Sequence, residues 1–152
     1  MNNRITLELV WWLVTAVIVA VIMFPIWKDF PEFKFQITNI AFIICFVTFV
    51  RYAFFLKHTF LAKFQLFKIV FVLGTIALVG ILMVQMQDFN VWLDKGDPNG
   101  LLNSVKETKR TALLEYIKSE FLFFAVGSML AALLLSGRLL VSYWRLVNRG
   151  KA

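Results

Sequence analysis

The apolar residues of this chain are gathered into four long runs, which cover residues 7–27, 37–56, 67–86 and 121–144. A helix needs about 20 residues to cross the hydrocarbon layer of a bilayer, so each run is long enough to do so. We therefore expect an all-α membrane protein whose four transmembrane helices form an up-down bundle. The 152 residues should make one transmembrane domain.

Composition supports this class. Hydrophobic residues make up 61% of the chain, and a water-soluble domain of this size could not bury so many unbroken apolar stretches. The first run is too long for a cleavable signal peptide, and no small-x-small cleavage pattern follows Met23, so we expect it to be a retained anchor.

Basic residues are distributed unevenly around the four runs. The connection between the second and third runs and the C-terminal segment carry many Lys and Arg residues without an acidic one, which places both, and both termini, on the cytoplasmic side. We expect a bacterial inner membrane. The net charge of +7 then requires no nucleic-acid partner, because anionic lipids of the inner leaflet attract such residues. The candidate lipid contacts are Lys57, His58, Lys63, Lys68, Arg145 and Arg149.

The connection before the fourth run predicts one further helix. After a turn-rich segment at 94–100, the apolar residues between 101 and 118 recur at helical spacing with polar residues opposite them. This pattern predicts an extracytoplasmic amphipathic helix that leads directly into the fourth span. Such a helix either lies on the membrane or bundle surface or serves as a docking surface for another protein.

Three charged residues fall within the ends of different spans. Glu8, Arg51 and Arg138 lie at similar depth on the cytoplasmic side of this topology. One hypothesis is an ion-pair cluster in which Glu8 bridges both arginines and the excess positive charge binds an anion. In the other, the arginines reach the headgroups and Glu8 lies in water. No acidic residue is expected at mid-depth in any span, which argues against a carboxylate-dependent pump.

The sequence predicts no catalytic, cofactor-binding or metal-binding residues. With His58 as its one histidine, the chain cannot supply two histidine ligands to a haem, and a histidine-rich metal site is not expected. The single cysteine, Cys45, lies within a span and is interpreted as a small core residue.

Small residues recur at helical spacing in two spans and predict close helix contacts. They are Ser128, Ala132 and Ser136 in the fourth span and Gly74, Ala77 and Gly80 in the third. Packing of these two spans against each other is the preferred interpretation, and an oligomer seam is the alternative.

These features favour a non-catalytic accessory or assembly subunit of a larger membrane complex, with another membrane protein or a second copy as its partner. The alternative is a small transporter or channel for an anionic or lipid-like substrate, built on Glu8, Arg51 and Arg138.

Overall fold

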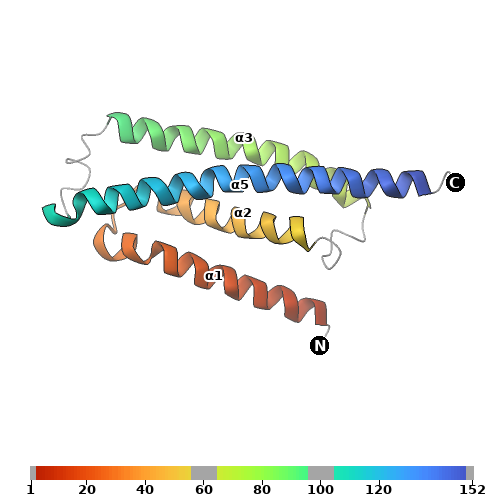
Figure 1. Ribbon diagram of the computed structural model, residues 1–152, viewed down its shortest axis with the longest axis horizontal. Coiled ribbons are helices and arrows are strands. Elements are labelled where there is room, and N and C mark those ends of the chain that lie inside the picture. Colours follow the sequence, from red (N-terminus) through yellow and green to blue (C-terminus); the bar gives the residue numbers. More distant parts are fainter. Residues whose placement is uncertain (1–2, 56–64, 96–104, 150–152) are drawn as a thin grey trace.

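The computed structural model describes residues 3–55, 65–95 and 105–149, and these residues form helices without any β-strand. The helices are α1 (Asn3–Asp29), α2 (Gln36–Phe54), α3 (Gln65–Lys95) and α5 (Glu107–Arg149). Successive helices run in opposite directions, and the chain begins and ends at the same end of the bundle (Figure 1). Each helix contains a segment long and apolar enough to cross a membrane. The expected class, an all-α integral membrane protein with four candidate spans, is confirmed at this level.

The central element is α5, which packs along both α2 and α3, while α1 lies mainly against α2 (Figure 1). One face of α5 is buried along most of the helix because its core residues recur every three or four positions. These residues are Leu113, Ile117, Phe121, Phe124, Ser128, Ala132, Leu135 and Leu139. The bundle is therefore built around this stripe.

The fourth span and the segment before it form one continuous helix. Its 43 residues correspond to a length of about 65 Å, roughly twice the thickness of the hydrocarbon layer. The amphipathic helix expected at 101–118 begins at Glu107, since Val105 and Lys106 are not helical and residues 101–104 lie outside the described ranges.

The amphipathic part of α5 packs onto the bundle. Leu113 and Ile117 are buried, and the hydroxyl of Tyr116 donates a hydrogen bond to the carbonyl oxygen of Ile22 in α1 at 2.7 Å. The ammonium group of Lys109 lies 3.5 Å from a carboxylate oxygen of Asp29, at the end of α1. The apolar side of this segment thus covers the bundle core.

Aromatic rings close the end of the bundle that lies opposite the termini. Phe33, Phe35, Phe89 and Phe121 are all buried there, and Trp92 packs against them. The rings of Phe89 and Phe121 are stacked with centroids 3.8 Å apart, and Phe35 meets Phe89 edge-on at 5.6 Å. This cluster connects the α1–α2 turn to α3 and α5.

Small residues let α5 approach its neighbours closely. Ser128, Ala132 and Ser136 are buried, and the Ser136 hydroxyl lies 2.6 Å from that of Thr75 in α3. A Cβ atom at Gly127 would lie 2.9 Å from the ring of Phe46 in α2, so only glycine leaves this ring in its place. The small-residue stripe of the fourth span therefore faces the interior.

The small residues of α3 face the other way. Gly74, Ala77 and Gly80 are all exposed, and a Cβ atom at either glycine would have no neighbour within 4 Å. The preferred contact between this stripe and the fourth span is thus not formed by the described residues.

Candidate functional site

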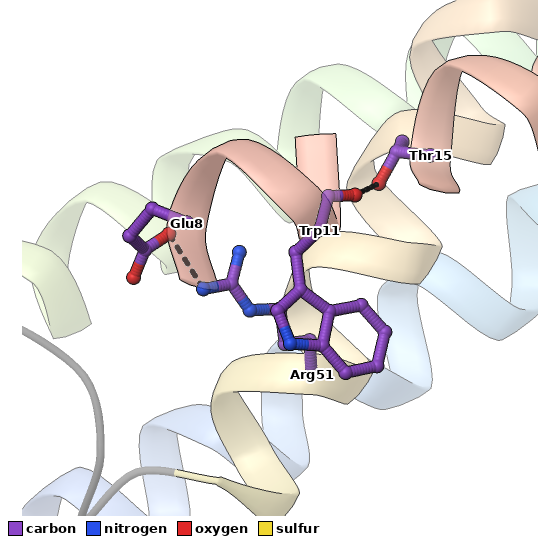
Figure 2. Close-up of polar contacts among 4 residues, drawn as sticks. All are labelled: Glu8, Trp11, Thr15 and Arg51. Atoms are coloured by element: carbon purple, nitrogen blue, oxygen red, sulfur yellow. Dashed lines mark hydrogen bonds and ion pairs between the residues drawn. The ribbon is translucent and has the colours of Figure 1, made fainter. Parts of the chain in front are cut away.

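Two of the three predicted charged residues lie together near the start of α1 and the end of α2. A guanidinium nitrogen of Arg51 is 2.5 Å from a carboxylate oxygen of Glu8. Figure 2 shows the Arg51 side chain reaching from α2 to Glu8 beside the indole of Trp11. The side chain of Arg51 is only 8% exposed, whereas that of Glu8 is 33% exposed.

Aromatic rings complete the surroundings of Arg51. Its guanidinium carbon lies 5.5 Å from the ring centroid of Trp11 and 5.2 Å from that of Tyr52, within the range of cation–π attraction. Contacts with one carboxylate and two aromatic rings therefore offset the free-energy cost of burying this arginine.

The threonine in the next turn of α1 forms its side-chain hydrogen bond within the helix. The hydroxyl of Thr15 donates to the carbonyl oxygen of Trp11 at 2.8 Å, as Figure 2 shows, so this buried threonine needs no partner on another helix. Among the described residues, the polar link from this part of α1 to α2 is the Glu8–Arg51 pair.

The third predicted member, Arg138, is exposed on α5 and forms no ion pair with any residue that the structure describes. Glu8 and Arg51 neutralise each other. An anion-binding role for Glu8, Arg51 and Arg138 stays a prediction.

For most of the expected lipid contacts, the structure does not describe the side chain. Lys57, His58 and Lys63 lie outside the described residues, and the structure places only the backbone of Lys68 and Arg149. Arg145 is exposed near the end of α5.

A second polar pair, missed in the sequence analysis, lies inside the opposite half of the bundle. The side-chain amide of Asn39 in α2 donates a hydrogen bond to a carboxylate oxygen of Glu120 in α5 at 2.5 Å. The same amide nitrogen is 3.4 Å from the sulfur of Met23 in α1. Three helices thus meet at one polar contact.

This pair is buried and only partly satisfied. Asn39 is 0% exposed and Glu120 is 8% exposed. The amide oxygen of Asn39 and the second carboxylate oxygen of Glu120 have no hydrogen-bond partner. Such acceptors destabilise a core unless a proton donor reaches them, so the pair is a costly element of the bundle.

The sequence contained a signal for Glu120. It follows the buried Ile117 by three positions and precedes the buried Phe124 by four, which is the spacing of the core face of α5. The apolar run that predicts the fourth span begins at residue 121, which leaves Glu120 at the end of the charged connection before it. The burial of Glu120 against α2 was therefore not expected.

Among the described residues, no group of three or more His, Cys, Asp or Glu side chains could hold a metal ion. Cys45 is a free, half-buried thiol. Comparisons with protein-family models, with curated proteins and with solved structures each gave no match.

Proposed function

We propose that the protein is a non-catalytic accessory or assembly subunit of a larger membrane complex. The observation that carries the proposal is the exposed face of α3 formed by Gly74, Ala77 and Gly80, which we call the α3 small-residue face. The opposite side of the same helix, with Val72, Thr75 and other residues, is buried against the rest of the bundle. In this proposal a helix of a partner protein, or of a second copy, packs on the α3 small-residue face.

Membrane energetics support this role for the face. Helix association in lipid depends on close packing, and glycine or alanine at the contact lets two backbones approach. Glycine is also a poor helix former, costing about 1 kcal/mol relative to alanine. Neither Gly74 nor Gly80 has a described neighbour that requires glycine, so the packing of the described helices does not account for them.

The polar residues of the spans support a structural rather than a catalytic role. Glu8 is paired with Arg51, and the hydroxyl groups of Thr75 and Ser136 contact each other. These contacts join helices of the same bundle. They do not gather reactive groups around a substrate.

The proposal includes a topology. Both termini lie at one end of the bundle (Figure 1), and the basic residues of the C-terminal segment favour the cytoplasm for that end. The aromatic cluster and the amphipathic part of α5 would then face the outer side of a bacterial inner membrane.

Affinity purification in mild detergent, followed by mass spectrometry, tests the role. We expect a membrane protein or a second copy to co-purify with the unaltered chain and to be lost in the Gly74→Leu/Gly80→Leu double variant. Gly137→Leu is the matched control, because Gly137 is also exposed with open space around its Cβ position, but on α5. A clean monomer without partners, or equal retention in both variants, would contradict the proposal.

A further inference from the structure

A cleft opens between the start of α2 and the last part of α3. It has a volume of about 780 Å³, within the range of small-molecule sites. It is lined by Lys34, Phe35, Thr38, Gln85, Asp88, Val91 and Trp92. The apolar segment of α2 begins at Gln36 and that of α3 ends at Asp94, so the cleft lies near the ends of both candidate spans.

The cleft holds two opposite charges that do not neutralise each other. Lys34 and Asp88 are both exposed, and neither forms an ion pair with a described residue. The ammonium group of Lys34 lies 5.6 Å from the ring centroid of Phe35, which holds it over a buried aromatic wall. A ligand in this cleft would therefore meet one positive group and one negative group.

Neutral hydrogen-bonding groups lie deeper along the two spans. The hydroxyl of Thr38 donates to the amide oxygen of Gln85 at 3.3 Å, joining α2 to α3. This bond occupies the oxygen of Gln85 and leaves its NH₂ group available as a donor. Gln85 and Asp88 are three residues apart, so they lie on the same face of α3.

We propose that this cleft binds the headgroup of a zwitterionic phospholipid that carries a phosphate and a primary ammonium group. Lys34 and the amide of Gln85 donate to the phosphate, and Asp88 accepts hydrogen bonds from the ammonium group. The phosphate and the ammonium complement the two unpaired charges.

The position of the cleft favours a lipid over a free metabolite. Ile37 and Val84, which directly precede Thr38 and Gln85, are 84% and 56% exposed and offer apolar surface to acyl chains. A headgroup held at the span ends keeps its chains in the hydrocarbon layer beside α2 and α3. The inference is independent of the partner-binding role of the α3 small-residue face.

Native mass spectrometry of the purified protein tests the headgroup. The protein is mixed with equal amounts of phosphatidylethanolamine, phosphatidylcholine and phosphatidylglycerol that have identical acyl chains. We expect phosphatidylethanolamine to occupy the protein about fivefold more than either competitor, because only its headgroup combines a phosphate for Lys34 with a positively charged N–H donor for Asp88. The ammonium group of phosphatidylcholine has no N–H, and the hydroxyl groups of phosphatidylglycerol are uncharged. Equal occupancy, or a preference for either competitor, would overturn the proposal.

Four variants assign the preference to the cleft. Asp88→Asn should reduce the preference for phosphatidylethanolamine over phosphatidylcholine, because a neutral amide oxygen accepts a weaker hydrogen bond from an ammonium group than a carboxylate does. Lys34→Gln should weaken binding of all three lipids. The control for Lys34 is Lys28→Gln, since Lys28 is exposed and its ammonium group lies 6.0 Å from the ring centroid of Phe24. The control for Asp88 is Asp94→Asn, an exposed acidic residue of α3 that does not line the cleft. An unchanged preference in Asp88→Asn would contradict the assignment.

A competition measurement separates a lipid from its soluble headgroup. We expect soluble phosphoethanolamine to displace bound phosphatidylethanolamine only at a large molar excess. Displacement at equimolar concentration would show that the headgroup alone is the ligand, and would overturn the lipid assignment.

Discussion

The side-chain amide of Asn39 lies 2.5 Å from a carboxylate oxygen of Glu120, and this hydrogen bond joins α2 to α5 inside the bundle. Both residues are buried, so each gives the other a hydrogen-bond partner in an otherwise apolar environment. Removing both partners should therefore cost less than the summed costs of removing each one alone.

Asn39→Ala should lower the free energy of unfolding by about 1–3 kcal/mol, because it leaves the Glu120 carboxyl group buried without a donor. The Asn39→Ala/Glu120→Ala double variant should lose less than the sum of the two single variants. Thermal unfolding in detergent measures both effects. Asn90→Ala is the control, since the half-buried Asn90 of α3 has no hydrogen bond to a described side chain. Strict additivity would show that the pair does not act as a unit.

Arg51→Gln should destabilise the packing of α1 on α2 by about 1–3 kcal/mol, since it leaves Glu8 unpaired and removes the cation beside Trp11. Arg51→Lys should restore only part of this loss, because a lysine cannot stack its charge on two rings in the same way. Unfolding by denaturing detergent reports the change. The exposed Arg138 provides the comparison, and an Arg138→Gln variant as unstable as Arg51→Gln would refute this account of the pair.

Gly127→Ala should destabilise the bundle by about 1–3 kcal/mol, because the new Cβ atom would lie 2.9 Å from the Phe46 ring and would force that ring to move. Gly137→Ala, where the surroundings are open, should be neutral or stabilise the helix by up to about 1 kcal/mol. Thermal unfolding of the two variants gives the comparison. If Phe46→Leu failed to relieve the effect of Gly127→Ala, a cause other than this contact would be indicated.

A comparison of Ala132→Leu with Ala77→Leu should distinguish an effect on folding stability from an effect on assembly. Ala132 is 0% exposed within α5, so the larger side chain should destabilise the isolated protein by about 1–3 kcal/mol or more. Ala77 is exposed on α3, so its substitution should leave the isolated protein stable and weaken only its association with a partner. Unfolding and size-exclusion chromatography in mild detergent measure the two effects. Equal loss of stability in both variants would contradict the outward orientation of Ala77.

The four helices and the membrane class could be predicted because long apolar runs carry that information directly. The contact of Arg51 with Glu8 could also be predicted, since both residues lie at similar depth on different spans. The exposure of Arg138 could not be predicted, because spacing along one helix does not show which side of that helix the neighbouring helices cover.

The same limit explains the α3 small-residue face. The sequence indicates that Gly74, Ala77 and Gly80 share one side of a helix, but only the arrangement of α3 against α5 shows that this side is exposed. The burial of Glu120 was missed for a different reason. Its charge outweighed the core-facing spacing of its neighbours Ile117 and Phe124.

Site-specific photo-crosslinking in native membranes tests the assembly role most directly. A photoreactive residue at position 77 lies on the α3 small-residue face, and one at position 21, where Val21 is 68% exposed on α1, serves as the control. We predict a discrete adduct with a partner membrane protein or a second copy from position 77 and lipid adducts alone from position 21. Lipid adducts alone from both positions would contradict the proposal that the α3 small-residue face is an assembly surface.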